Sequence, residues 1–284
     1  MYKYVRFPNF KLKALTLSYD DANRQDKRLI AIMQKYGLKG TFNINSGAYG
    51  EEYQGVEKGR MSKKEAIDLY TNSGMEIGIH GYHHISLTDV DTELAIDEIL
   101  TDRKDLEKTF NRVVKGMSYA YGAYNDEVVD LLKKLGVYYS RTTNCTGKFD
   151  IPTDWLRLPT TCHHKDECLM DFAKEFVEIK EESRFWRNKL QMFYLWGHSY
   201  EFDNDNNWDV IANFAKYVGN REDIWYATNG EIFAYLKSAE QLRFSADGKF
   251  VENPSAKDIY INYINQKCVV PSGATVKIET GEII

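Results

Sequence analysis

Short β-rich runs alternate with amphipathic stretches over residues 1–238, and this alternation limits the possible folds more than any other feature of the sequence. Strands that alternate with helices favour a parallel sheet covered by those helices. About seven such units predict an α/β fold in which the sheet closes into a (β/α) barrel. The seven runs with strand character are Ala14–Tyr19, Gly40–Asn45, Glu76–His80, Gly116–Tyr121, Val137–Thr143, Met192–His198 and Asp223–Thr228.

The segments between these runs carry helix signals. Lys27–Tyr36 precedes Gly37, a residue type suited to the end of a helix. Lys63–Asn72 follows Ser62, which can form a capping box with Glu65. The further helices that we expect are Thr92–Phe110, Asp126–Leu135, Asp166–Glu182, Trp208–Val218 and Glu231–Lys237.

Residues 239–284 have a different character from the rest of the chain. They show no helical period and carry turn signals such as Asp247-Gly248 and the Pro-Ser-Gly sequence at 271–273. The sequence therefore predicts a barrel over residues 1–238 and a small β-rich appendage over residues 239–284. Because so short a segment cannot bury an independent core, we expect it to pack on the barrel.

The charge balance excludes some classes of partner. The chain has 37 Lys and Arg against 42 Asp and Glu, a net charge of −5. It therefore lacks the excess of positive charge with which proteins bind nucleic acids of any base sequence. No apolar run is as long as the roughly 20 residues of a membrane span.

The first ten residues lack the apolar segment of a signal peptide, and the four Cys form no CxxC pair. We expect a cytoplasmic protein with reduced thiols, and the sequence does not indicate its oligomeric state.

Two adjacent carboxylates, Asp20 and Asp21, follow the first predicted strand. Barrel active sites collect at such C-terminal strand ends. Because two buried, ionised carboxylates repel each other, the pair is more plausible if one binds a cation while the other handles protons. The alternative is an ordinary turn or helix cap.

His80 and His84 follow the third predicted strand with a spacing that places both on one side of a helical turn. The alternative is a surface cluster, but three of the six His fall within five residues, which favours metal ligation. His198 ends a later strand. An Asp with two His makes a metal set with open positions, as hydrolytic zinc sites require. A second Asp and His198 would then supply a base and an acid.

In their order and spacing these motifs resemble the polysaccharide deacetylase family, carbohydrate esterase family 4, whose domain is also called the NodB-homology domain. Ser18–Ala22 (SYDDA) is similar to its TFDDG motif, and Gly40–Ile44 (GTFNI) to its second-strand signature. His80–His84 is similar to its His-x-x-x-His motif, and Leu195–His198 to its Leu-x-x-His motif. The resemblance covers roughly residues 12–236 and implies a distorted (β/α) barrel.

The resemblance implies a ligand set and a cofactor. Asp21, His80 and His84 would bind one divalent metal ion, with zinc expected first and cobalt, nickel, iron or manganese as alternatives. A bound metal brings the pKa of water from about 15.7 towards about 7, so that a nearby carboxylate can remove its proton.

The resemblance also implies a reaction. Asp20 would be the general base, His198 the general acid, and a backbone N–H near Tyr121 would assist the oxyanion. The implied enzyme is a hydrolase that removes N-acetyl groups from amino sugars of a chitooligosaccharide, a peptidoglycan fragment or a related glycan. Two alternatives stay open: a metal-dependent hydrolase of a non-sugar amide or ureide C–N bond, and a carbohydrate-binding protein with a vestigial site.

The third family motif departs from the pattern. The family has Arg-x-Pro-Tyr-Gly, but this chain has Ser118 in the Arg position. Arg141 and Arg157 are candidate replacements, with surface salt bridges as the alternative. We expect a replacement, because a buried pair of aspartates with one divalent cation still benefits from further positive charge.

Three further features have an open interpretation. Trp155, in the region of the fourth family motif, would line the sugar site or belong to the core, and Arg157 would be a second substrate contact. A second metal site at Cys162, His163, His164 and Cys168 is disfavoured, because this spacing is not a known closed zinc pattern.

Overall fold

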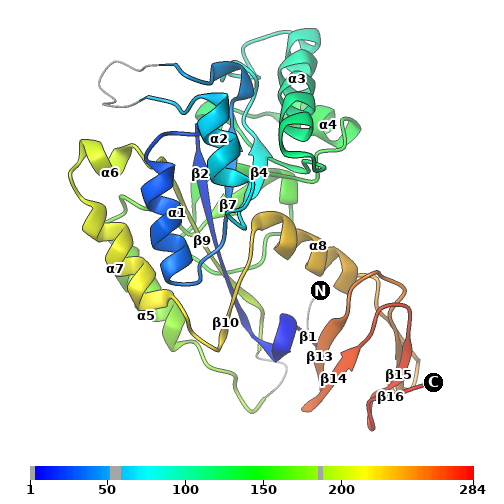
Figure 1. Ribbon diagram of the computed structural model, residues 1–284. Coiled ribbons are helices and arrows are strands. Elements are labelled where there is room, and N and C mark those ends of the chain that lie inside the picture. The colour runs from blue at the N-terminus through cyan, green and yellow to red at the C-terminus, as the bar shows by residue number, and fades with distance from the viewer. Residues whose placement is uncertain (1–3, 52–58, 185–187) are drawn as a thin grey trace.

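The computed structural model describes residues 4–51, 59–184 and 188–284, and its centre is a parallel β-sheet (Figure 1). Nine strands of the described chain form this sheet in the order β7-β6-β5-β4-β3-β2-β9-β8, with β10 also paired to β2. Their bounds are β2 Lys13–Asp20, β3 Gly40–Ile44, β4 Glu76–Ile79, β5 Gly116–Ser118, β6 Tyr139–Cys145, β7 Leu158–Thr160, β8 Cys162–His163, β9 Gln191–Gly197 and β10 Ile224–Tyr226.

One short segment closes the sheet into a barrel. β7 pairs with β6 at one edge of the strand order, and β8 pairs with β9 at the other edge. Only Thr161 separates β7 from β8, and its N–H donates to the carbonyl oxygen of Tyr194 at 2.8 Å. The predicted α/β barrel is therefore confirmed, although β7 and β8 were not among the seven predicted strands.

β2 is the central strand of the barrel, and all eight of its residues are buried. β9 pairs along one side of it, while β10 and β3 share the other side near its start and its end. A strand with three neighbours holds its last residue, Asp20, firmly inside the C-terminal end of the barrel. The candidate site lies at this end.

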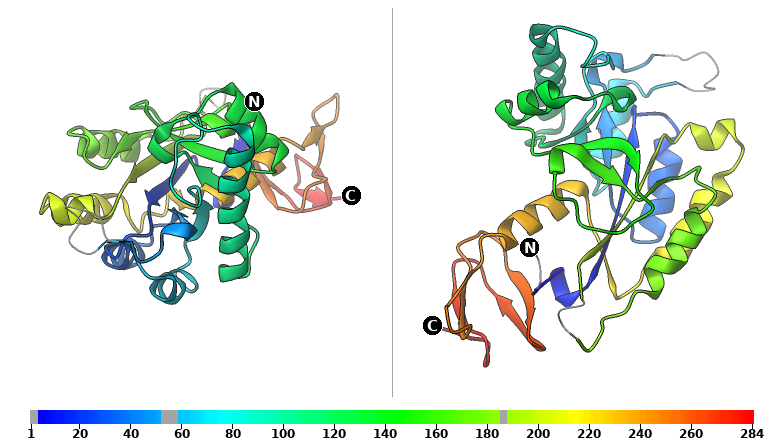
Figure 2. Two further views of the ribbon diagram at one scale, coloured as in Figure 1. Left: turned by 90° about the horizontal axis from the view of Figure 1, so that it is seen from above. Right: turned by 180° about the vertical axis from the view of Figure 1, so that it is seen from behind.

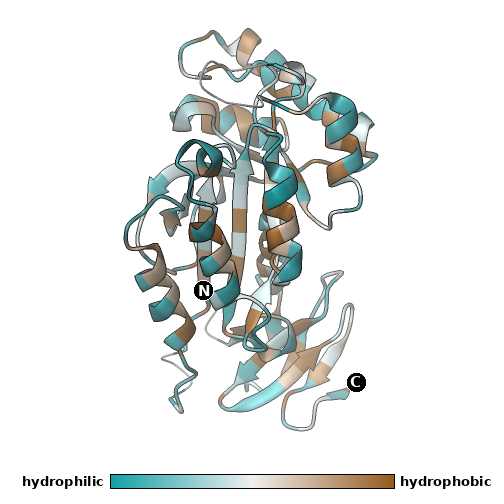
Figure 3. Ribbon diagram, turned by 60° about the vertical axis from the view of Figure 1, so that its left-hand side comes forward, coloured by the Kyte–Doolittle hydropathy of each residue, from teal (hydrophilic) through white to brown (hydrophobic). Residues whose placement is uncertain are grey.

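Amphipathic helices cover the sheet. Hydrophilic and hydrophobic residues alternate along them (Figure 3), and α1 buries Leu29, Ile30 and Met33 against the core. The predicted capping box at Ser62 and Glu65 is present. The helix predicted to begin at Asp166 begins three residues later, at Leu169. No helix among the described residues combines the length and apolar composition needed to span a membrane. The bounds are α1 Asp26–Lys35, α2 Lys63–Tyr70, α3 Thr92–Phe110, α4 Asp126–Lys134, α5 Leu169–Glu178, α6 Glu201–Asn204, α7 Trp208–Val218 and α8 Asn229–Ala239.

The strands that follow α8 form two small antiparallel sheets beside the barrel (Figures 1 and 2). The first strand of the chain, β1 (Val5–Arg6), joins one of these sheets by pairing with β13. The start of the chain is therefore built into the β-rich end, which the sequence did not indicate. The remaining strands are β11 Arg243–Phe244, β12 Phe250–Glu252, β13 Ile259–Tyr263, β14 Gln266–Val270, β15 Thr275–Lys277 and β16 Glu282–Ile283.

Candidate active site

The two adjacent aspartates reach the same imidazole. His80 Nε2 lies 3.7 Å from Asp20 Oδ2 and 3.8 Å from Asp21 Oδ1. Neighbouring residues of a regular strand point to opposite faces, so a continued strand could not bring both carboxylates together. β2 instead ends at Asp20, and Asp21 has a left-handed φ of 78°. This turn gathers both carboxylates at the barrel end.

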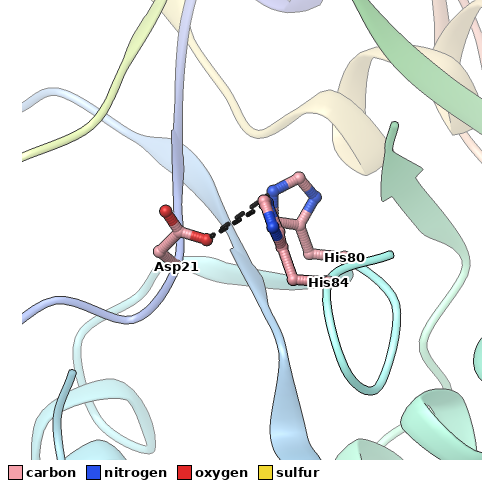
Figure 4. A group of neighbouring side chains, drawn as sticks. All are labelled: Asp21, His80 and His84. Carbon is pink, nitrogen blue, oxygen red and sulfur yellow. Dashed lines mark ion pairs between the residues drawn. The ribbon is translucent and has the colours of Figure 1, made fainter. Parts of the chain in front are cut away.

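Asp21, His80 and His84 form a compact donor group (Figure 4). Their ligand-type atoms all lie within 4.8 Å of one another, and His84 Nε2 is 3.6 Å from Asp21 Oδ1. Burial and the neighbouring His80 lower the pKa of His84 to about 4, so its imidazole is neutral at neutral pH. One carboxylate with two neutral imidazoles is a typical donor set for a divalent metal.

The hydrogen bonds of His80 fix a tautomer that suits metal binding. Its Nδ1 lies 2.9 Å from the backbone oxygen of Ser118, and because a carbonyl can only accept, Nδ1 carries the proton. Nε2 therefore presents a lone pair towards Asp21. A second hydrogen bond of this kind is the usual support of a metal-binding histidine. The residues present thus fit a divalent metal.

Asp20 is held by three donors from three different strands. Asn43 Nδ2 donates to Oδ1 at 2.8 Å, Ser118 Oγ donates to the same oxygen at 3.1 Å, and the Arg141 guanidinium donates to Oδ2. Burial by itself raises the pKa of Asp20. Arg141, His80, His198 and the Asn43 amide together outweigh it, so the pKa lies well below its ordinary value. Asp20 is therefore ionised and fixed in orientation, as a general base must be.

Arg141 supplies the positive charge beside Asp20 that Ser118 cannot supply. Ser118 and Arg141 are direct neighbours in the pairing of β5 with β6. The guanidinium is buried and packs 4.3 Å from the Trp196 ring. The hydroxyl of Ser118 lies 2.8 Å from His80 Nδ1 as well as close to Asp20, so Ser118 bridges the two.

Arg157 does not take this role. Its guanidinium donates to Asp154 at 2.6 Å and to Asp126, and its side chain is 32% exposed. These are surface salt bridges, the alternative interpretation of this residue.

A second arginine, Arg60, lies beside the donor group and was missed in the sequence. Its Nη2 is 3.1 Å from Asp21 Oδ1, and its Nη1 is 2.8 Å from Glu51 Oε2. The N–H of Met61 also donates to the oxygen of Ala22 at 2.8 Å, which ties this segment to the turn after β2. Burial raises the pKa of Asp21, but His80 and further cations including Arg60 lower it overall.

His198 follows β9 and faces a carboxylate that sequence reasoning also missed. The backbone N–H of His198 donates to Glu201 Oε2 at 3.1 Å, and its Nδ1 lies 3.4 Å from the same oxygen. Burial disfavours protonation of His198, but the bond to Glu201 and the charges of Asp20 and Asp21 outweigh it and raise its pKa. A Glu three residues after His198, in a helical turn, was the signal available in the sequence.

Of the substrate contacts predicted from the sequence, Tyr121 lies at the edge of the donor group and Trp155 lies in the core. Tyr121 is 71% exposed, has a left-handed φ of 56°, and its ring lies 4.6 Å from that of His84, so it borders the donor group. Trp155 is buried and packs edge-to-face on Phe233 at 5.3 Å. These contacts place Trp155 in the core under α8 instead of in a sugar site.

The Cys and His of residues 162–168 do not assemble as one metal site. Cys162 is buried and Cys168 is exposed, and neither belongs to a donor group among the described residues. His163 instead joins His198 and Glu201 in a second group of ligand-type side chains.

Comparison with known proteins finds similarity to polysaccharide deacetylases. The polysaccharide deacetylase family model matches residues 8–140. The poly-β-1,6-N-acetyl-D-glucosamine N-deacetylase of Staphylococcus aureus strain MSSA476 is 26% identical over an alignment of 146 residues, and the match covers 48% of this chain and 50% of that protein. The chain thus spans about half the length of this relative.

Two solved structures share the fold. A protein from Mycobacterium smegmatis, named for the polysaccharide deacetylases, aligns with a TM-score of 0.57 and 16% identity over 84% of this chain and 94% of that chain. A mutant of a carbohydrate esterase family 4 pseudoenzyme aligns with a TM-score of 0.50 and 14% identity over 81% and 70%. Because this fold occurs in a pseudoenzyme, the fold does not decide whether the chain is active.

The barrel, its donor group and the motifs around it define the carbohydrate esterase family 4 class of fold. Over residues 8–140 the chain is similar to the polysaccharide deacetylase family.

Proposed function

We propose that this protein is a metal-dependent hydrolase that removes N-acetyl groups from amino sugars of a glycan. One observation carries the proposal: the donor group of Asp21, His80 and His84 lies beside Asp20. Asp20 is ionised and accepts hydrogen bonds from Asn43, Ser118 and Arg141. An ionised carboxylate beside a donor group of this kind is what a general base requires, and these hydrogen bonds keep Asp20 in that form.

The donor group would hold one divalent ion, with zinc the best match to one carboxylate and two imidazoles. When bound, such an ion supplies Lewis acidity for the amide oxygen and acidifies water. Arg60, already beside Asp21, compensates part of its negative charge.

Asp20 would accept the proton of the attacking water. Asn43, Ser118 and Arg141 occupy its other lone pairs and keep the carboxylate from rotating. The water oxygen bonds to the acetyl carbon, and the C–N bond breaks.

His198 would protonate the departing amine. Its Nδ1 faces Glu201, which leaves Nε2 to serve the reaction, and its raised pKa favours the protonated form that a general acid needs. The products are acetate and a glucosamine unit. The two proton carriers come from different strands, β2 and β9, which are direct neighbours in the sheet.

The substrate class follows from the relatives. The staphylococcal relative is named for poly-β-1,6-N-acetyl-D-glucosamine, which supports a polymer or oligomer of N-acetylglucosamine as the substrate here. Hydrolysis of a non-sugar amide is the second candidate, because the donor group and Asp20 act on the C–N bond and do not read the sugar.

Acetate release tests the proposal. The protein should release acetate from acetylated chitooligosaccharides or from poly-β-1,6-N-acetylglucosamine, and a chelator should abolish the release. Activity on simple acetamides alone would favour the second candidate. No release from any amide by the metal-loaded protein would contradict the proposal.

His80→Ala should remove the metal. We expect about one equivalent of zinc per chain in the unmodified protein and close to none in the variant, because the loss of one of three protein ligands leaves too few. Elemental analysis after dialysis measures this.

His83→Ala is the matched control. His83 lies three residues after His80, but its Nδ1 contacts Glu98, and His83 is not part of the donor group. It should therefore retain the metal. Equal metal content in both variants would show that His80 is not a ligand.

A further inference from the structure

A single carboxylate oxygen next to the acid His198 is shared by two other imidazoles. His163 Nε2 and His164 Nε2 each lie 3.3 Å from Glu201 Oε2, and His198 Nδ1 lies 3.4 Å from it. His164 has no exposed surface on its side chain, and neither of its ring nitrogens has a hydrogen bond among the described residues. This group plays no part in the chemistry assigned above except through His198.

The tautomer of His163 indicates a hydrogen-bonded group and not a metal site. The backbone N–H of Lys165 donates to His163 Nδ1 at 3.1 Å, so Nδ1 holds a lone pair and Nε2 carries the proton. His163 thus points an N–H at Glu201. Metal ligation through Nε2 would need the opposite tautomer, with a lone pair on Nε2.

We propose that His163 is a positioning residue for the acid His198: His163 Nε2 and His198 Nδ1 lie 3.3 and 3.4 Å from the same oxygen of Glu201, so His163 limits how strongly Glu201 holds His198. The proposal rests on the proposed function, in which His198 protonates the leaving amine.

The charges around His198 give the expected direction. Asp20 and Asp21 face it from the end of β2, and Glu201 faces it from α6. From the segment at β8, His163, His164 and Lys165 face the shared carboxylate, and Lys165 Nζ lies 3.3 Å from Glu201 Oε1..

His164 does not contribute a charge, because burial and His163 lower its pKa to about 3. Each N–H that donates to Glu201 withdraws negative charge from the oxygen that stabilises the His198 cation. Removal of the His163 N–H should therefore raise the pKa of His198. Removal of the Glu201 charge should lower it.

A general acid works better when its pKa is kept from rising far above the working pH. General acid catalysis is most effective when the pKa of the acid lies near the working pH, because the group must be protonated and must also release its proton. Asp20, Asp21 and Glu201 all raise the pKa of His198, and an N–H that points at Glu201 opposes that rise.

The experiment is a titration of the imidazole nitrogens by ¹⁵N NMR on the metal-loaded full chain with labelled histidine. His163→Phe keeps a ring but removes the donor, and it should raise the midpoint of His198 by roughly half a pH unit. Glu201→Gln should lower that midpoint by about one pH unit or more. His163→Gln keeps an N–H donor and should leave the midpoint close to that of the unmodified protein.

Opposite shifts in the first two variants are the signature of a shared carboxylate, because a loss of packing would not move them in opposite directions. The alkaline limb of the kcat profile should follow, upwards in His163→Phe and downwards in Glu201→Gln. An unchanged midpoint in His163→Phe, or a shift in the same direction as in Glu201→Gln, would overturn the proposal.

The unmodified protein supplies a test that needs no variant to fold. The ¹⁵N shifts should show His163 with its proton on Nε2, and the opposite tautomer would overturn the proposal. A second equivalent of zinc that perturbs His163 and His198 together would overturn it in favour of a metal site. Since none of these signals requires a substrate, failure to release acetate would count against the proposed function alone.

Discussion

Asp20→Asn should lower kcat for acetate release by about 10²–10⁴-fold, the usual contribution of a positioned proton-transfer group. Asn has the same shape but cannot accept the proton of water, so the loss isolates the proton transfer. The donor group of Asp21, His80 and His84 is unchanged, and the metal content should stay at its original value. Acetate release at saturating substrate and elemental analysis on the same preparation measure both quantities.

Asp26→Asn is the control for a neutralised buried aspartate. Asp26 is fully buried on α1, its Oδ2 accepts a hydrogen bond from the Tyr70 hydroxyl at 2.5 Å, and burial raises its pKa to about 7. It does not contact the donor group, so its variant should retain kcat within several-fold. Full activity in Asp20→Asn would assign the base to another residue.

Arg141→Met should reduce the free energy of unfolding at neutral pH by about 3–5 kcal/mol, because it leaves the buried Asp20 charge without its main partner. The folded-state pKa of Asp20 lies below its unfolded value, so the ion pair stabilises the protein above the unfolded pKa. That stability is lost as the pH falls through the folded pKa. The variant should therefore lose most at neutral pH and least in strong acid.

The pH dependence of activity should also change in Arg141→Met. With the guanidinium gone, burial raises the pKa of Asp20, and the acidic limb of the kcat/KM profile should move to higher pH. Urea unfolding at several pH values and the kcat/KM profile measure the two effects.

Arg157→Met is the matched control, because its surface salt bridges should contribute only about 0–1 kcal/mol. Ser118→Arg in the Arg141→Met background returns the charge to the family's position and should recover part of the acidic limb. An acidic limb that does not move in Arg141→Met would show that Asp20 does not depend on this guanidinium.

The sequence predicted the strand ends well because β-rich runs and helix signals are local. Asp20, Asp21, His80 and His198 could each be placed at the end of a strand, and parallel strands bring such ends together at one edge. Their mutual approach in the barrel follows from this pattern.

The partners of these residues could not be predicted in the same way, because they depend on pairing between distant strands. Nothing local distinguishes Arg141 from Arg157, and the contact of Arg141 with Asp20 joins β6 to β2, two strands that are not paired with each other. Arg60 likewise reaches Asp21 from a segment with no strong pattern. The Trp155 side chain could not be assigned to core or cleft until α8 was in place above it.

The closing segment of the barrel divides the site into two halves that can change separately. The metal-type donors and Asp20 come from β2 and the residues after β4, inside the continuous part of the sheet. His163 comes from the two-residue strand β8, which has β9 as its only partner in the described sheet. Under the proposed function, fraying of β8 would disturb the surroundings of the acid and leave the donor group of Asp21, His80 and His84 in place. The acid side of such a site could therefore change independently of the side that would hold the metal.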